Sequence, residues 1–208
     1  MTKLFIFFLL LSVGTALGHR HVTFSAPAQC KKLECAPYRV VKTMKGFEVR
    51  NYSPSNWIAT RPIRSSSYLD AIDKGFTTLF QYIEGSNEMR KKMNMTAPVL
   101  VDVEYGGDGN RPASFVVHFY LEKEYQSKAP ASREALIVKL PKYRFAAVRR
   151  FGGYMNDTSI PSQALALKRS MEEHGLSSPV NGYSVAGYDG PDDLTNRVNE
   201  VIMWFDKM

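Results

Sequence analysis

The residue types that most often carry enzyme chemistry are scattered along this sequence. Catalysis by a nucleophile needs a serine, cysteine or threonine within reach of a positioned base, and no recognised local motif of that kind occurs. His118 and His174 each stand alone, outside any pattern of zinc ligands. The glycines of residues 106–110 lie between two strand patterns, as in a hairpin turn and not in a phosphate-binding loop. We therefore expect a protein that is not an enzyme.

The first 18 residues have the pattern of a secretory signal peptide. Lys3 supplies the positive charge, an apolar run covers residues 4–13, and Ala16-Leu17-Gly18 suits cleavage. The apolar run is about ten residues long, whereas a membrane-spanning helix needs about 20. We expect cleavage after Gly18 and secretion of the mature protein. In the chain, the signal peptide is followed by an N-terminal arm over residues 19–37.

Secretion decides how the two cysteines are interpreted. Cys30 and Cys35 are close in sequence, and an oxidising compartment allows them to form a disulfide that closes a small loop. A metal site would need further ligands, and the nearest histidines, His19 and His21, lie at the expected mature N-terminus. Because the loop is short, we expect the disulfide to hold the arm more than the whole fold.

Three sequons for N-glycosylation follow from the same compartment. Asn156 is the best candidate because it lies in a polar stretch after two glycines, where a loop is expected. Asn94 precedes a strand start, so a glycan and an unmodified side chain are equally compatible with its position. Asn51 lies inside a strand pattern and is followed by Ser53-Pro54, which favours an unmodified asparagine.

The net charge of +7 raises the question of a nucleic-acid partner. The basic residues gather in three clusters, at residues 90–92, 139–144 and 149–150. They lack the aromatic platform or the helix-turn-helix pattern that converts charge into nucleic-acid recognition. We expect no nucleic-acid partner. In a secreted protein, this charge would instead attract acidic glycans, anionic lipid head groups or the carboxylates of a ligand.

An amphipathic helix is predicted from Ser67 onward. Its apolar residues recur at helical spacing and form one broad stripe that should be buried against a neighbouring element. This stripe contains Leu69, Ile72, Phe76, Leu79, Phe80 and Ile83. Ser67 suits the N-cap, Gly85 suits a left-handed ending, and Pro98 suits the first residues of a strand that follows.

A second set of elements repeats the order of the first. Strand patterns cover residues 47–52, 57–63, 95–105 and 114–121 in the first half, and 135–140, 143–151, 183–188 and 198–205 in the second. A second helix is predicted over residues 161–174, where His174 falls on the face of Leu167 and Met171 as an ordinary helix-end histidine. In the strand at 114–121, Phe115, Val117 and Phe119 should face the core. This periodicity predicts an α+β protein.

Several segments together resemble the SOUL, or heme-binding protein, family. They are residues 46–52 (GFEVRNY), 57–60 (WIAT), 85–87 (GSN) with 95–99 (MTAPV), 151–153 (FGG), 187–188 (GY) and 197–201 (RVNEV). The resemblance covers residues 38–208, which we treat as one SOUL domain. It implies two strand-helix-strand-strand pseudo-repeats that form a distorted, mostly antiparallel β-barrel flanked by two helices.

The resemblance also implies a ligand, heme or a related tetrapyrrole, bound and not catalytic. A porphyrin is a flat apolar disc with two carboxylates, so its site needs an apolar or aromatic wall with cations at the edge. In the family the porphyrin lies on or near the first helix. The corresponding candidates here are Phe76, Leu79, Phe80, Ile83, Lys74, Arg90 and Lys91.

The chain departs from the family pattern at the expected iron ligand. Some family members have a histidine between the arginine and tyrosine of the early strand, where this sequence has Asn51. Other members use basic residues on the first helix, where the nearest equivalents here are Asp73 and Gln81. The axial ligand is therefore unknown. The alternatives are His118, His174, Met93, a tyrosine, or binding through apolar burial alone.

Two main hypotheses for function follow. The first is a secreted carrier or scavenger of heme or a related tetrapyrrole with modest affinity. The second is an extracellular interaction protein that keeps the fold but has lost porphyrin binding, and that meets a partner through its basic surface or its second helix. A third, a tetrapyrrole-modifying enzyme, rests on analogy between folds alone.

Overall fold

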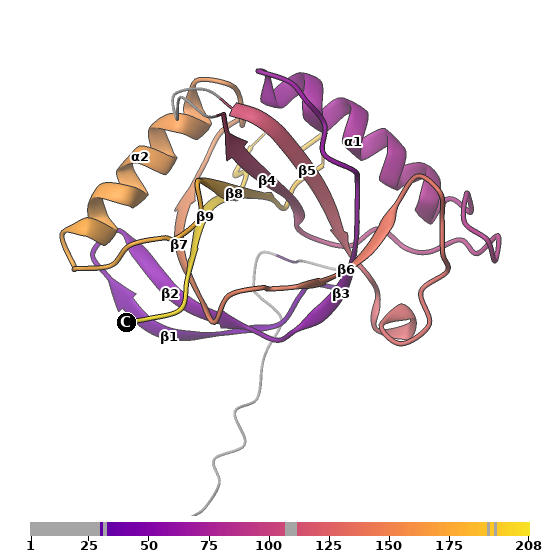
Figure 1. Cartoon of the computed structure of the whole chain (residues 1–208), viewed down its shortest axis with the longest axis horizontal. Helices are drawn as coiled ribbons and strands as arrows, with labels where there is room; N and C mark the ends of the chain where they lie inside the picture. The colour runs from indigo at the N-terminus through magenta and orange to yellow at the C-terminus, as the bar shows by residue number, and fades with distance from the viewer. Residues whose placement is uncertain (1–29, 31–32, 107–111, 191, 194) are drawn as a thin grey trace, which may run out of the picture.

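The structure is a computed structural model that describes residues 30, 33–106, 112–190, 192–193 and 195–208. Nine strands form a single curled sheet with two helices on its outer face, as Figure 1 shows. The strands are β1 (Tyr38–Met44), β2 (Phe47–Tyr52), β3 (Ser55–Ala59), β4 (Val99–Tyr105), β5 (Pro112–Tyr120), β6 (Leu136–Leu140), β7 (Phe145–Phe151), β8 (Gly182–Gly187) and β9 (Asn199–Phe205). The helices are α1 (Tyr68–Ile83), α2 (Ser159–Glu172) and a short 3-10 helix, η2 (Lys123–Tyr125).

The order of the strands in the sheet reveals two related halves. The order is β1-β2-β7-β9-β8-β4-β5-β3-β6, and all strand pairs within this sheet are antiparallel. The unit β3-α1-β4-β5 corresponds to β7-α2-β8-β9, and the two units meet where β4 pairs with β8. The prediction of an α+β fold with two strand-helix-strand-strand repeats is confirmed. The sheet is curled into a half-barrel.

The main core lies between the sheet and the two helices. α1 packs against β5, whereas α2 packs against β7 and β9. Phe115, Val117 and Phe119 of β5 are buried in this core, as their alternation predicted. The intervening His118 and Tyr120 are also buried, because this end of the inner face of the sheet is covered as well.

A second apolar cluster covers the inner face of the sheet. It contains the disulfide Cys30–Cys35 and neighbouring apolar side chains such as Trp57 and Ile202. The described residues 33–37 of the arm are held there by backbone contacts, since the Ala97 amide donates to the Glu34 carbonyl at 2.9 Å and Cys35 bridges to the same residue. The predicted disulfide is present, and its two cysteines pack against the sheet.

Both ends of α1 form as the sequence predicted. The Ser67 hydroxyl accepts a hydrogen bond from the Asp70 amide at 3.3 Å, and Gly85 adopts a φ of +109° just after the last turn. Gly75 lies where α1 meets β5, and a Cβ there would lie 2.3 Å from the Val117 side chain. The close approach of helix and strand therefore requires glycine at this position.

The buried face of α1 differs from the predicted stripe. The residues that α1 buries are Tyr68, Ala71, Gly75, Leu79, Tyr82 and Ile83. Leu69 and Phe80 of the stripe are 52% and 42% exposed, so the expectation of complete burial is wrong for these two. The apolar stripe is wider than the strip that β5 covers, and one edge of it stays at the surface. No described helix is both long enough and apolar enough to cross a membrane.

Candidate functional site

The uncovered edge of α1 presents an aromatic surface. The rings of Phe76 and Phe80 stack with their centroids 5.7 Å apart and an angle of 14° between their planes. Phe76 is half-buried and its ring contacts Phe119 of β5 edge-on at 5.2 Å, which holds the pair in place. Leu69 lies two turns before Phe76 on the same side of the helix. We call Leu69, Phe76 and Phe80 the α1 ledge.

The other two apolar candidates from the sequence lie beneath this surface. Leu79 and Ile83 are 0% and 5% exposed and pack in the main core between α1 and the sheet. In this conformation they support the helix and have no surface to offer a ligand. The structure therefore separates the predicted apolar set into a buried pair and an aromatic pair at the surface, of which Phe80 is exposed and Phe76 is half-buried.

The three predicted cations are not equally placed around the α1 ledge. Lys74 forms an exposed pair with Asp70 at 2.8 Å and lies about 160° around the helix from Phe76, at 100° per residue. Arg90 and Lys91 are exposed and follow the end of the helix at which Phe80 lies. Asn87 orders their loop, because its side chain accepts from the Lys91 amide at 3.0 Å and donates to the Lys91 carbonyl at 2.7 Å. Arg90 and Lys91 are thus the candidate cations at the Phe80 end of α1.

The structure places the candidate iron ligands away from the α1 ledge. His118 is buried on the inner face of the sheet, with its Nε2 atom 3.6 Å from Asp102 Oδ2. His174 is exposed at the end of α2, where Nδ1 lies 2.8 Å from the Ser170 carbonyl. The Asn51 side chain donates to the Arg144 carbonyl at 2.7 Å. Met93 is buried in the core below α1. Neither described histidine shares a surface with the stacked phenylalanines.

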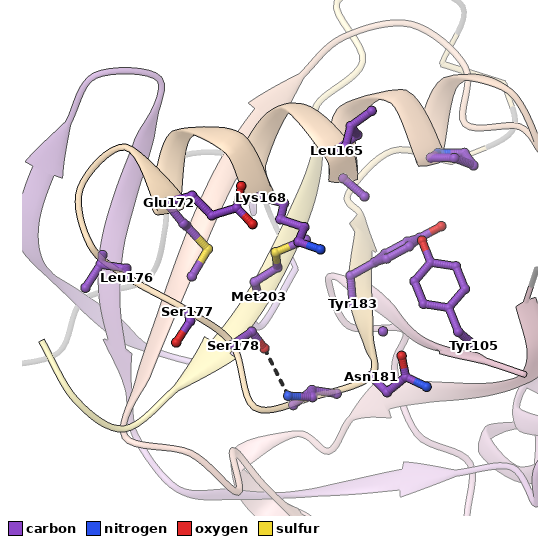
Figure 2. Close-up of a pocket in the computed structure, with 15 residues that line it drawn as sticks. Tyr105, Leu165, Lys168, Glu172, Leu176, Ser177, Ser178, Asn181, Tyr183 and Met203 are labelled. Carbon is purple, nitrogen blue, oxygen red and sulfur yellow. Dashed lines mark hydrogen bonds between the residues drawn. The ribbon is translucent and has the colours of Figure 1, made fainter. Parts of the chain in front are cut away.

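A cavity lies beside the second helix, as Figure 2 shows. It has a volume of about 330 Å³ and opens between α2, the segment 176–183 and the end of β9. The buried side chains of Met171, Leu176, Tyr183 and Met203 form its apolar floor. Its residues are distinct from those of the α1 ledge. Sequence reasoning missed this cavity, although Lys168 among the apolar residues of the second helix is a local signal for it.

Polar groups stand at the edge of this cavity. Lys168 and Glu172 are one turn apart on α2, and both line the opening. Tyr105 and Tyr183 meet edge-on with their ring centroids 5.8 Å apart. Burial is the main cause that raises the pKa of both phenols above the ordinary value of 10.0. Both tyrosines therefore stay protonated at neutral pH, which disfavours them as anionic ligands of a metal ion.

The predicted modification sites differ in how free the asparagine nitrogen is. The Asn156 side-chain oxygen accepts from the backbone amides of Thr158 and Ser159 at 2.9 and 2.7 Å, and the residue is exposed. A glycan on its nitrogen would leave these bonds intact. The Asn94 nitrogen instead donates to Glu122 at 2.7 Å, a bond with which attachment would compete.

Comparison with known proteins identifies the family of this fold. A family model described as "SOUL heme-binding protein" matches residues 33–204, which include both halves of the sheet and both helices. The chain belongs to the SOUL heme-binding protein family. Its members are named as binding proteins, and the prediction of this family from the sequence is confirmed.

Similar SOUL proteins occur in vertebrates. Over 156 residues the chain is 33% identical to heme-binding protein 2 of Homo sapiens, covering 74% of this chain and 76% of that protein. It is 30% identical to heme-binding protein 2 of Mus musculus over 80% of this chain and 81% of the relative. It is 28% identical to heme-binding protein 1 of Xenopus laevis over 77% and 83% of the two chains. This SOUL domain therefore includes the α1 ledge and the α2 cavity within a fold of known family.

Proposed function

We propose that this protein binds heme or a related tetrapyrrole on the α1 ledge and carries it outside the cell. The observation that carries the proposal is the stacked pair of Phe76 and Phe80, of which Phe80 is 42% exposed. Exposed aromatic rings held rigidly by the core offer a flat apolar surface that suits the face of a porphyrin. Membership of the SOUL heme-binding protein family supports this ligand class.

The charges beside the ledge suit the edge of the same ligand. Arg90 and Lys91 carry the positive charge that porphyrin carboxylates require, and both are exposed to solvent. The two described histidines lie elsewhere, so apolar burial and these charges hold the porphyrin without an axial ligand from either of them. Binding that depends on a partly open surface has modest affinity, as a carrier that must also release its ligand requires.

The proposed location outside the cell rests on separate observations. The signal-peptide pattern of residues 1–18 lies outside the described residues and remains a prediction. The disulfide Cys30–Cys35 supports an oxidising compartment, since such bonds persist mainly in secreted proteins. The exposed Asn156, with its side-chain nitrogen available, is the proposed glycosylation site. Asn94 is a weaker candidate because of its bond to Glu122.

A titration with two porphyrins tests the proposed ligand. Residues 19–208 would be titrated with hemin and with iron-free protoporphyrin, followed by Soret absorbance and by quenching of Trp57 and Trp204 fluorescence. We expect saturable one-to-one binding of both porphyrins with similar affinity, because the ledge supplies stacking without an iron ligand. Much tighter binding of hemin would contradict this mode and indicate axial ligation.

Two substitutions test the proposed surface. Phe80→Ala should weaken binding of both porphyrins about tenfold, since stacking on an aromatic ring contributes about 1 kcal/mol beyond the lost apolar area. Tyr154→Ala is the matched control, because Tyr154 is 54% exposed but lies in the loop before α2, stacked under Arg197. Equal affinities for the two variants would place the porphyrin elsewhere. Binding of neither porphyrin by the wild-type protein would favour the extracellular interaction protein.

A further inference from the structure

We propose that the cavity beside α2 is a second binding site, which takes an apolar molecule with a single carboxylate, such as a medium-chain fatty acid. This site is separate from the α1 ledge. The α2 cavity is lined by α2, by residues 176–183 and by Tyr105 and Met203, and its residues include no member of the ledge. The proposal therefore stands whether or not a porphyrin binds α1.

The floor of the cavity favours an apolar ligand group. Met171, Leu176 and Met203 are 1%, 8% and 7% exposed, and their side chains form a continuous surface with Tyr183. Methionine side chains adapt to ligands of different shape because they are unbranched and polarisable. Leu165 at the rim is 49% exposed, so apolar surface continues from the floor to the solvent. A ligand that enters this cavity would cover that surface.

The volume limits the size of the ligand. A volume of about 330 Å³ lies at the lower end of the range, roughly 300–1,000 Å³, in which small-molecule sites fall. Divided by the roughly 30 Å³ that one water molecule takes in the liquid, it holds about eleven groups of that size. An alkyl chain of about ten carbons is a suitable match, and a whole porphyrin is too large to be enclosed.

Lys168 supplies the charge that recognises the carboxylate. Within the described part of the chain, its ammonium group makes no hydrogen bond and no ion pair. Lys168 is exposed and lines the cavity, and Figure 2 shows its side chain extending from α2 among the lining residues, on the side of Met203. An exposed lysine at the edge of an apolar cavity is positioned to pair with the anionic head of a ligand whose tail lies on the floor.

Glu172 limits the number of negative charges that the ligand can carry. It lies one helical turn from Lys168 and lines the same opening, so it repels a second anionic group on the ligand. The nearby Ser178 hydroxyl is already used, since it donates to the Trp204 carbonyl at 2.8 Å and accepts from the Val180 amide at 3.2 Å. Lys168 is the one cation among the described residues that line the cavity, so it selects a carboxylate, and a monocarboxylate is preferred over a dicarboxylate.

Calorimetric titration with decanoate tests this site. The full mature chain would be titrated with decanoate and with decyltrimethylammonium, both below their micelle concentrations. We expect one-to-one binding of decanoate and no saturable binding of the cation. Lys168→Met should weaken decanoate binding about tenfold, the effect of losing one charge-assisted hydrogen bond. Lys74→Met on α1 is the matched control and should leave the affinity unchanged.

A second variant predicts a change in the opposite direction. Glu172→Gln removes the repulsion and should tighten decanoate binding about threefold, in line with a loss of several tenths of a kcal/mol of like-charge repulsion. Because tighter binding does not arise from a damaged fold, this result separates recognition from stability. Equal binding of the anionic and cationic probes, or unchanged affinity in both α2 variants, would overturn the proposal. Displacement of decanoate by hemin would also overturn it, since the cavity would then be a porphyrin site.

Discussion

Arg50 and Glu200 form a buried ion pair on the inner face of the sheet. Their side chains are 1% and 0% exposed, and two guanidinium nitrogens donate to the two carboxylate oxygens at 2.9 and 3.0 Å. The Tyr188 hydroxyl donates to the same carboxylate at 2.8 Å. Since β2 and β9 are separated by β7 in the sheet, this pair connects strands that share no backbone hydrogen bonds.

Removing the charge of Glu200 should therefore destabilise the protein strongly. Glu200→Gln removes the fully buried counter-charge of Arg50 and leaves only the partly exposed Glu48 carboxylate, 2.8 Å from the guanidinium. We expect the free energy of unfolding to fall by about 3 kcal/mol, the lower end of the range for breaking a buried pair. Unfolding in urea would measure this change in the free energy of unfolding. Glu84→Gln is the control, because the pair of Glu84 with Lys92 is exposed and such pairs contribute at most about 1 kcal/mol. Similar losses in the two variants would contradict this interpretation of the buried pair.

His118 makes stability depend on pH. Burial lowers the pKa of His118 below its ordinary value of 6.5, and the nearby Asp102 only partly opposes this effect. Below about pH 6.5 the unfolded chain binds a proton that the native histidine resists, so the free energy of unfolding falls as the pH falls. The loss is at most about 1.4 kcal/mol per pH unit for one group.

Unfolding at two pH values would measure the contribution of His118. Between about pH 7.5 and about pH 5.5, His118→Gln should lose less stability than the wild type, because glutamine does not titrate. An identical pH dependence in the wild type and His118→Gln would show that other groups cause it.

The contact between α1 and β5 depends on Gly75. A Cβ at this position would lie 2.3 Å from Val117 Cγ2 and 3.1 Å from Ile63 Cδ1, so the helix would have to move away from the strand. Alanine favours a helix by about 1 kcal/mol over glycine. Overpacking of a tight core contact costs about 1–3 kcal/mol.

Gly75→Ala should therefore destabilise the protein in spite of its better helix propensity. We expect a net loss of up to about 2 kcal/mol in urea unfolding, together with weaker porphyrin binding, because Phe76 is the next residue on the helix. Thr77→Ala at an exposed position of α1 is the matched control and should keep the stability of the wild type or raise it slightly. A stabilised Gly75→Ala variant would show that α1 is free to shift.

The connection of the N-terminal arm to the sheet is a property of the whole molecule. The disulfide closes a loop with a sequence separation of 5, and its sulfur atoms belong to the apolar cluster on the inner face. Replacing both Cys30 and Cys35 by serine should lower the free energy of unfolding by about 2 kcal/mol, as expected for so short a loop. Porphyrin binding should persist, because the cysteines and the α1 ledge lie on opposite faces of the sheet. Loss of binding in the folded variant would contradict this separation.

Much of the fold could be predicted because its signals are local. The N-cap at Ser67, the glycine ending at Gly85 and the alternation through Phe115 and Val117 each depend on a few adjacent residues. The elements therefore formed close to the predicted positions, although α2 begins at Ser159, two residues before the predicted start, and ends at Glu172. The candidate site was harder to predict, since hydrophobicity alone does not distinguish the buried Leu79 from the exposed Phe80.

The sequence by itself determined the class of fold, the order of the elements, the pairing of the two cysteines and the family. The class of fold and the order of the elements follow from backbone preferences and periodicity, and the family follows from motif order. The cysteine pairing follows from the short separation of Cys30 and Cys35. Each of these signals acts over a short stretch of chain. Only the tertiary structure decided which side of α1 stays uncovered, because the position of β5 and the contact at Gly75 set the strip that is buried. It alone brought Tyr105, Lys168 and Met203 to one cavity, since contacts between residues so distant in sequence exist only after the sheet has folded.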